Sequence, residues 1–139
     1  MAGYAYVPHY RLEGATGGGD LVEETGPDCF LAFGRQWVEQ RLRTVPEGLR
    51  VIRADDDAMA PTILRGDALL VDTGQCPLVD GGVYLVRHAG EAQVRRLFSA
   101  LGSRVRILPD NPQFSPAEGD RAGDAFGIVG RVLWIGRML

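Results

Sequence analysis

The sequence predicts a mostly β domain with one or two short helices. Three observations support this fold class. From about Leu49 onward, segments rich in β-branched and aromatic residues alternate with turn residues. A tight turn joins two of these segments, and only one long stretch has helical periodicity. The chain has 139 residues, of which 45% are apolar and 24% charged. This composition is ordinary for a single folded domain that buries roughly two-thirds of its unfolded surface.

The N-terminal segment predicts a strand followed by a loop. Tyr4 to Leu12 has the composition of a short strand, which we expect Pro8 to interrupt. The glycine-rich sequence GATGGGD follows at residues 14–20. It lacks the GxGxxG spacing of a phosphate-binding loop, so we expect an exposed loop rather than a phosphate cradle.

One amphipathic helix is predicted next. Its apolar residues recur at near-helical spacing with charged residues between them, and Pro46 would follow its end. We expect these apolar residues to face the core: Phe30, Phe33, Trp37, Val38 and Leu42.

Six further segments have the composition of strands, and they cover residues 51–54, 68–73, 82–88, 92–98, 104–110 and 125–138. Ala89-Gly90-Glu91 is predicted to join two of them in a tight hairpin. Pro61 suits the first turn of a short helix over Thr62 to Leu64, which Gly66 would end. No internal repeat and no long linker divides this region.

Charge and composition exclude several functions. The formal net charge is −3, which argues against direct binding of nucleic acid by this chain, because phosphate binding needs a basic face. All 15 basic residues are Arg, and there is no Lys. No side-chain amine is therefore available as a Schiff-base former or general base, since guanidinium stays protonated at working pH.

No metal site or cofactor is predicted. Cys29 and Cys76 have no metal-binding or redox spacing, and His9 and His88 are isolated. We expect both thiols to be buried and structural. The N-terminus has no cleavable apolar segment and no long apolar run follows, so a cytoplasmic protein with no membrane contact is expected.

A run of three carboxylates, Asp55-Asp56-Asp57, precedes the Pro61 turn. It lacks the spaced oxygen ligands of a calcium loop, so a cation site is disfavoured. The simplest alternative is that these residues cap the turn and face solvent.

Several short motifs follow one another along the chain, namely DAMAPT at 57–62, RGD at 65–67, LVD at 70–72, VRRL at 94–97, LPDNP at 108–112, FSP at 114–116 and IVGRVLW at 128–134. Their order resembles that of LexA-type self-cleaving proteins and phage-repressor C-terminal domains. This resemblance implies one LexA-type domain over 1–139, with a cleavage-loop-like segment and helix in 1–49. Residues 50–139 would form a β core of twisted antiparallel sheets.

This family cleaves itself with a Ser–Lys dyad, in which a desolvated lysine takes the proton of the serine hydroxyl. The resemblance maps the two positions onto Ala58 and Arg95. Neither supplies the required group, because alanine has no nucleophilic oxygen and guanidinium cannot accept a proton at neutral pH. The scissile bond would correspond to Thr16-Gly17. The resemblance therefore implies a pseudo-peptidase with no active catalytic residue.

A third interpretation of the acidic run follows. Asp56 or Asp57 would pair with Arg95 or Arg96 across the former active site, beside a turn shaped by Met59 and Pro61. Charge-assisted hydrogen bonds would then replace the dyad with a structural contact.

The resemblance implies a C-terminal dimerisation and regulatory domain of a phage-type repressor. DNA would be read by an upstream helix-turn-helix that this chain lacks. The C-terminal run containing Val132, Trp134 and Ile135 is predicted to form the homodimer interface. The alternative is that this run is a central core strand.

Two further functions remain open at this stage. One is a self-cleaving repressor peptidase whose serine was replaced by Ala58 in the laboratory. The other is a UmuD-like polymerase accessory protein. Without self-cleavage, an antirepressor or a separate protease would release the repressor from DNA. RecA-stimulated processing, as in the SOS response, is the rival trigger.

Overall fold

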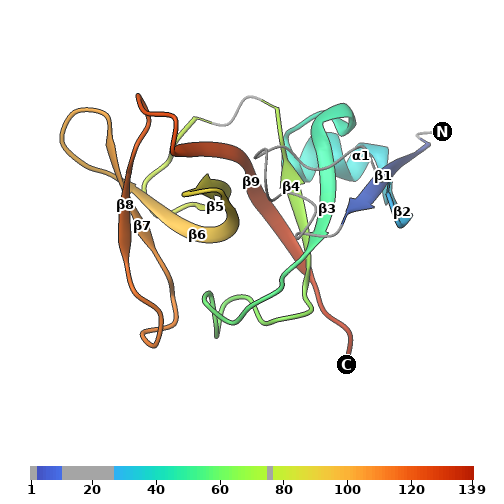
Figure 1. Cartoon of the computed structure of the whole chain (residues 1–139). Helices are drawn as coiled ribbons and strands as arrows, with labels where there is room; N and C mark the ends of the chain where they lie inside the picture. Colours follow the sequence, from blue (N-terminus) through green and yellow to red (C-terminus); the bar gives the residue numbers. More distant parts are fainter. Residues whose placement is uncertain (1–2, 11–26, 75–76) are drawn as a thin grey trace.

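The computed structural model describes residues 3–10, 27–74 and 77–139, and its strands form one mixed nine-stranded sheet (Figure 1). The strand order is β2-β1-β3-β4-β9-β5-β6-β7-β8. The strands are β1 (Tyr4–Tyr10), β2 (Cys29–Gly34), β3 (Leu49–Arg53), β4 (Ala68–Asp72), β5 (Val83–His88), β6 (Glu91–Ser99), β7 (Arg104–Leu108), β8 (Ala117–Asp120) and β9 (Phe126–Gly136).

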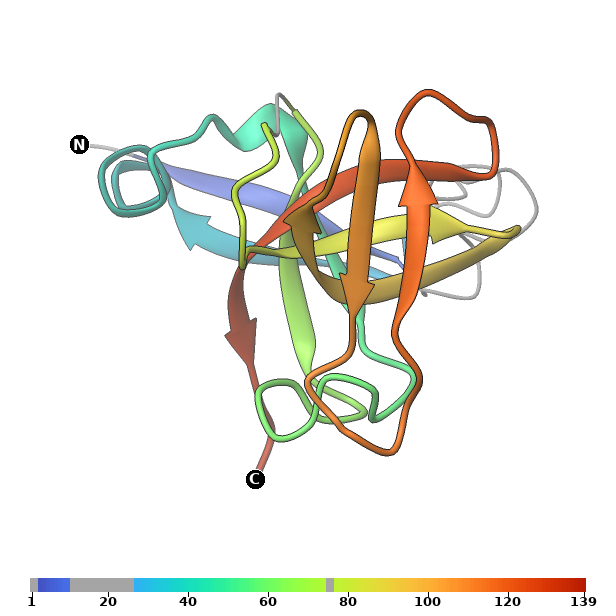
Figure 2. The same ribbon diagram turned by 90° about the vertical axis from the view of Figure 1, so that its left-hand side faces the viewer.

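Strand β9 joins the two halves of the sheet. It pairs antiparallel with β4 on one side and with β5 on the other. The edge strands β2 and β8 therefore lie at opposite ends of the molecule (Figure 1), and Figure 2 looks onto the end formed by β6, β7 and β8. Most pairs are antiparallel, but β1 runs parallel to β3. The predicted mostly β fold class with twisted antiparallel pairing is confirmed, with β1–β3 as a parallel pair.

The six strand segments predicted from residue 51 onward are confirmed as β3, β4, β5, β6, β7 and β9. The hairpin between β5 and β6 is also confirmed. Ala89 and Gly90 both have positive φ angles, 52° and 82°, as a two-residue hairpin turn requires. Strand β8 was not predicted, because its sequence AEGD has the composition of a turn.

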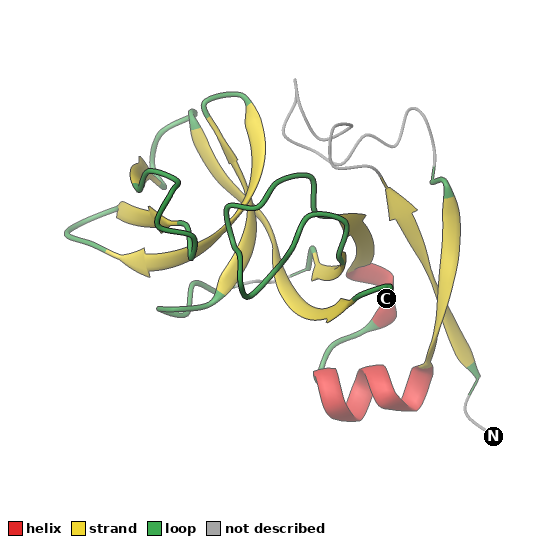
Figure 3. Ribbon diagram, turned by 90° about the horizontal axis from the view of Figure 1, so that it is seen from below, coloured by secondary structure: helices red, strands yellow, loops and turns green. Residues whose placement is uncertain are grey.

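The predicted helix over residues 30–42 is wrong in its first half. Residues 29–34 form strand β2, which pairs along its length with β1. Helical structure begins only at α1 (Arg35–Trp37) and continues as the π-helical turn η2 (Val38–Leu42), followed by the 3-10 turn η3 (Pro46–Gly48); Figure 3 shows these helical segments. A short apolar run fits either structure, and the pairing with β1 decides for the strand.

Three smaller expectations are also corrected. Thr62 to Leu64 form no helix but part of a turn, in which the N–H groups of Thr62 and Ile63 both donate to the Met59 carbonyl. Pro8 lies inside β1 instead of interrupting it, just ahead of the two residues that pair with β3. Cys29 is exposed, not buried, because β2 is an edge strand.

The core consists of three clusters along the sheet. One, which includes Ile52, Met59 and Leu85, lies under the β3–β4 connection. A second surrounds the fully buried Tyr84 beside β7. The third, around Val38 and Leu70, holds the helical segment against the sheet. The first cluster positions the candidate site.

Candidate functional site

The segment between β3 and β4, residues 54–67, folds into a compact loop, here called the aspartate turn. Its two ends are joined because the Ala54 N–H donates to the Asp67 carbonyl at 2.9 Å and the Gly66 N–H donates to the Ala54 carbonyl at 2.8 Å. In Figures 1 and 2 this turn lies beside the β7–β8 connection and near the C-terminus. Three chain segments therefore meet here.

Ala58 is fully buried in this turn. Its N–H donates to Asp56 Oδ1 at 3.0 Å, and its carbonyl accepts the Asn111 N–H at 2.9 Å. Met59, next in the chain, packs into the first core cluster. The Ala60–Pro61 peptide bond is cis. The backbone at Ala58 is thus fixed from both sides, by a side chain of the turn and by the β7–β8 connection.

Arg95 reaches the same turn from the middle of β6. The residue is only 9% exposed, and its Nη1 donates to the Val94 carbonyl at 2.8 Å. Nη1 also lies 3.9 Å from Asp56 Oδ2. Burial lowers the pKa of Arg95, and the nearby Asp56 carboxylate opposes this shift. The contact with Asp56 is an ion pair rather than a hydrogen bond.

Asp56 therefore has two roles at once. One carboxylate oxygen caps the Ala58 N–H, and the other faces the Arg95 guanidinium. The capping interpretation and the ion-pair interpretation of the acidic run both describe this residue. Asp57 differs, since its Oδ1 accepts the Arg65 N–H at 3.1 Å and its Oδ2 lies 4.0 Å from Arg65 Nε. Asp57 thus stabilises the turn internally.

Arg96 has a partner that sequence reasoning missed. Its Nε and Nη2 donate to the two carboxylate oxygens of Asp110 at 2.9 and 2.8 Å, and Nη1 donates to the Gly81 carbonyl. The Thr62 hydroxyl also donates to Asp110, at 2.6 Å. The hydrogen bond from Arg96 holds the pKa of Asp110 below its ordinary value. The LPDNP motif contains Asp110, but nothing in its spacing names Arg96 as its partner.

Asn111 completes the contact between the β7–β8 connection and the aspartate turn. Its side-chain Nδ2 donates to the Asp57 carbonyl at 3.0 Å, in addition to the backbone bond to Ala58. Asp110 and Asn111 together bind three groups of the turn, the Thr62 hydroxyl and the backbone carbonyls of Asp57 and Ala58. The turn is therefore held in place from outside its own segment.

A further carboxylate, that of Asp67, anchors the other end of the turn. It is 2% exposed and accepts hydrogen bonds from Arg137 Nε at 2.7 Å and Nη2 at 2.6 Å. Its Oδ2 also accepts the Leu64 N–H at 2.8 Å. The Arg137 hydrogen bonds lower the pKa of Asp67, and desolvation by burial works against this shift. Arg137 lies directly after β9, so this pair joins the turn to the end of the central strand.

Little space remains between the turn and β6. A cavity of about 10 Å³ is lined by Ala54, Asp55, Asp56, Met59, Ile63 and Val94, which is room for one water molecule and not for a peptide. Burial raises the pKa of Asp55, and repulsion by the Asp56 carboxylate adds to this shift. Within the described ranges, no group of three or more His, Cys, Asp or Glu residues could hold a metal ion.

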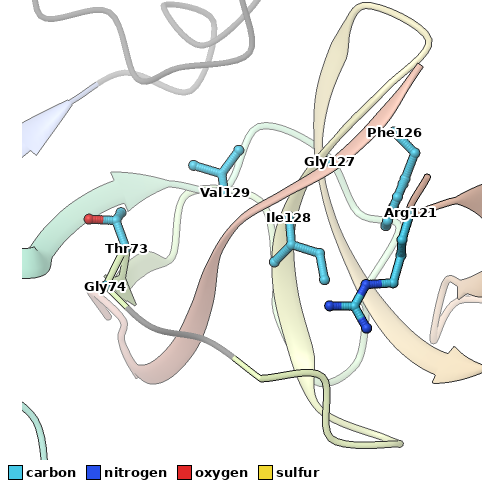
Figure 4. A pocket seen from close by; sticks show the side chains of 7 residues that line it. All are labelled: Thr73, Gly74, Arg121, Phe126, Gly127, Ile128 and Val129. Carbon is cyan, nitrogen blue, oxygen red and sulfur yellow. The ribbon is translucent and has the colours of Figure 1, made fainter. Parts of the chain in front are cut away.

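A larger cavity lies elsewhere. It measures about 290 Å³ and is lined by Thr73, Gly74, Arg121, Phe126, Gly127, Ile128 and Val129 (Figure 4). It shares no residue with the aspartate turn or with β6. The charged side chain in this lining is that of Arg121, and a guanidinium cannot act as a general base. The lining residues therefore do not combine a nucleophile with a general base.

The predicted interface residues lie on β9, which is hydrogen-bonded on both sides. Val132 and Ile135 pack against the first core cluster. Trp134 makes edge-to-face contacts with Phe33 and Trp37, at centroid distances of 5.5 and 6.3 Å, and remains 38% exposed. Thr16, Gly17 and Cys76 lie outside the described residues.

Comparison with known protein families establishes how this chain is related to them. Residues 8–133 match the model of a family described as Peptidase S24-like. The chain belongs to the Peptidase S24-like family. This confirms the resemblance seen in the ordered motifs, and the family includes self-cleaving members.

Two proteins that are similar to this chain are named as repressors. It is 28% identical over 131 residues to the repressor protein CI of Enterobacteria phage phi80, covering 92% of this chain and 54% of the phage protein. It is 38% identical over 77 residues to a LexA repressor from Acidithiobacillus ferrooxidans, covering 55% of this chain and 37% of that repressor. The chain thus spans about half the length of the phage repressor and less of LexA. Among the described residues, no helix has the length and apolarity to cross a membrane.

We expect the Asp67–Arg137 pair to stabilise the fold at neutral pH and to stop doing so in acid. A carboxylate whose folded pKa lies below its ordinary value of 3.8 stabilises above that value, and the contribution is lost as pH falls through the lowered one. Asp67→Asn should therefore reduce the urea midpoint at pH 7, and the difference from wild type should be smaller at a pH below the ordinary value of 3.8. Asp124→Asn, at an exposed loop position, is the matched control. An equal loss at both pH values would contradict this prediction.

Proposed function

We propose that this chain is the C-terminal regulatory and dimerisation domain of a phage-type repressor, with a degenerate self-cleavage site. Membership of the S24 family and the similarity to a phage CI repressor and a LexA repressor support the repressor assignment. The proposal of a degenerate self-cleavage site rests on the two side chains at the positions that correspond to the family's Ser–Lys dyad. Ala58 presents a buried methyl group, and Arg95 presents a buried guanidinium that faces Asp56.

Two chemical requirements of the reaction are unmet at this site. An acyl transfer needs a nucleophilic atom, and Ala58 has none. It needs a base with a pKa near neutrality, and even with burial the guanidinium remains a cation. The ion pair and the Asp56 cap occupy the place of the reacting groups.

A repressor of this type would act as a homodimer in the cytoplasm, where its DNA lies. DNA would be bound by a helix-turn-helix domain upstream, and the distance between paired domains would set the half-site spacing of the operator. We assign the dimer surface to the exposed side of Trp134 on β9, next to Val132 and Ile135. Release from DNA would then need an outside agent, such as an antirepressor or a separate protease, with RecA-stimulated cleavage as the rival.

Restoring the dyad should restore the reaction. The wild-type chain should remain intact during long incubation at alkaline pH or with activated RecA filaments. The double variant Ala58→Ser/Arg95→Lys should release two fragments cut near Gly17, detected by intact-mass spectrometry, because it supplies an oxygen and a titratable amine at the two positions. Each single variant is a control and should stay uncut. Cleavage of the wild-type chain would overturn the degenerate-site proposal.

The Asp56–Arg95 pair should contribute only modestly, because Asp56 is partly exposed and the nearest atoms are 3.9 Å apart. Arg95→Met should nevertheless destabilise the fold, since it also removes the buried hydrogen bond to the Val94 carbonyl. In a double-mutant cycle with Asp56→Asn, we expect a coupling of about 0.2–1 kcal/mol, measured by urea unfolding. An Arg95→Met variant as stable as wild type would contradict a structural role for this pair.

Dimerisation through β9 can be tested by light scattering coupled to size exclusion. Trp134→Ala should shift the protein towards a smaller species at a given concentration, because an exposed aromatic side chain at an interface centre carries much of the binding energy. Leu101→Ala is a matched control, since Leu101 is an exposed apolar residue in the β6–β7 turn. The same mass for wild type and Trp134→Ala would remove Trp134 from the dimer surface.

A further inference from the structure

Strand β2 is an unprotected sheet edge among the described residues. Within residues 3–10, 27–74 and 77–139 it stands at one end of the strand order and pairs only with β1. Its sequence, CFLAFG, contains no charged residue and no proline, and its first four residues are exposed. Natural proteins normally protect an exposed edge with charges, proline or a covering element, because unpaired N–H and C=O groups invite another strand. Strand β2 contains neither of the two protective residue types, charged residues and proline.

The opposite edge of the same sheet is protected. Strand β8 has four residues, two of them the acidic Glu118 and Asp120. Glu118 accepts two hydrogen bonds from Arg104 on the neighbouring strand β7, at 3.2 and 2.8 Å. Short length and charge are established ways of blunting an edge. The two edges of this sheet therefore differ: β8 is short and charged, whereas β2 is longer and carries no charge.

The backbone groups that β2 offers can be identified from its register. The Arg35 N–H donates to the Gly3 carbonyl at 3.0 Å, in line with the pairing of Phe33 with Ala5 and of Leu31 with Val7. Hydrogen-bonding direction alternates along an antiparallel strand. The N–H and C=O groups of Phe30, Ala32 and Gly34 therefore point away from β1, towards the free edge.

An exposed aromatic face adjoins this edge. Paired residues of an antiparallel ladder lie on the same face, so Phe30 shares a face with Pro8, and Ala32 with Tyr6. Tyr4, Tyr6 and Phe30 are 64%, 70% and 60% exposed. The β1–β2 ribbon thus combines a free edge with an apolar face, and the opposite face holds the fully buried Val7.

We propose that β2 pairs antiparallel with β2 of a second copy of this chain, which makes one sheet continuous through two molecules. This contact is separate from the β9 surface assigned above. An isologous pairing fits because the segment carries no charge, so two copies bring no like charges together along it. It also closes after two molecules, as a two-fold contact must.

The side chains favour one register. Residues whose N–H and C=O groups point to the free edge must pair with residues of the same kind in the partner. A register centred on Ala32 meets this condition, because it places Phe30 opposite the partner's Gly34. A ring over a glycine in the facing strand fills the space that the glycine leaves. Asp28 precedes β2 and Arg35 follows it, so antiparallel pairing brings the acidic end of one copy to the basic end of the other.

Combined with the β9 dimer, this contact would join dimers into a larger closed or extended assembly. Without the β9 dimer, it would by itself give a dimer. Trp134 contacts Phe33 of β2, but Ala32 lies on the opposite face of that strand from Phe33, so a change at Ala32 leaves the Trp134 contact intact. The contact can therefore be tested independently of the proposed repressor function.

The experiment compares charge variants by size exclusion with light scattering at matched concentrations. Ala32→Lys places two like charges at the two-fold axis, while its exposed position leaves the β1 pairing unchanged. Its mass should be half that of a closed wild-type assembly, and less than half that of an extended one. Leu101→Lys adds the same charge at an exposed turn and should keep the wild-type mass. Circular dichroism and thermal melting would verify that both variants are folded.

A cross-linking arm fixes the register. In a Cys29→Ser/Cys76→Ser background, Ala32→Cys should oxidise to a covalent dimer, since opposed residues of a ladder have Cα atoms about 5.5 Å apart. Leu101→Cys in the same background sets the level of random collision. The proposal is overturned if Ala32→Lys keeps the wild-type mass, or if Ala32→Cys cross-links no faster than Leu101→Cys. A Trp134→Ala effect without an Ala32→Lys effect would retain the β9 dimer and reject this contact.

Discussion

The aspartate turn is held against the sheet by carboxylates that meet arginines or backbone N–H groups. Asp110 binds Arg96 and Thr62, Asp67 binds Arg137, and Asp56 lies between the Ala58 N–H and Arg95. Each carboxylate connects segments that are distant in sequence or closes the turn itself. Bidentate arginine–carboxylate pairs fix orientation as well as distance. The position of the buried Ala58 methyl group follows from these contacts, because both its N–H and its carbonyl are bound by them or their neighbours.

Arginine suits this arrangement better than lysine would. A guanidinium keeps its charge when desolvated and offers several donors in a plane, whereas a buried ammonium tends to lose its proton. Arg95 uses this property, since it is nearly buried, binds a backbone carbonyl and still faces a carboxylate. The chemistry that makes a lysine useful as a base is the chemistry that arginine lacks. Under the proposed function, the same buried position would thus have changed from proton transfer to structural pairing.

Local patterns were enough to predict most of the β core, and long-range pairing explains what they missed. The six strands after residue 51 and the Ala89-Gly90 turn follow from composition and turn chemistry nearby. The partners of Asp67 and Asp110 lie 70 and 14 residues away, and no spacing rule connects them. Strand β8 looks like a turn until Arg104 pairs with Glu118 across the ladder. The ordered motifs located the site, but the geometry around Asp56 needed the fold.

The error at β2 has a physical cause that also bears on the surface of the protein. Its apolar residues were assigned to a helix because they continue the near-helical spacing of Trp37, Val38 and Leu42. Pairing with β1 makes them a strand, yet leaves Phe30, Tyr4 and Tyr6 in water. Exposed apolar area is unfavourable in proportion to its size, and an open edge adds backbone groups that only water satisfies. A pattern that suits burial, placed where one chain cannot bury it, is best explained by contact with a second chain.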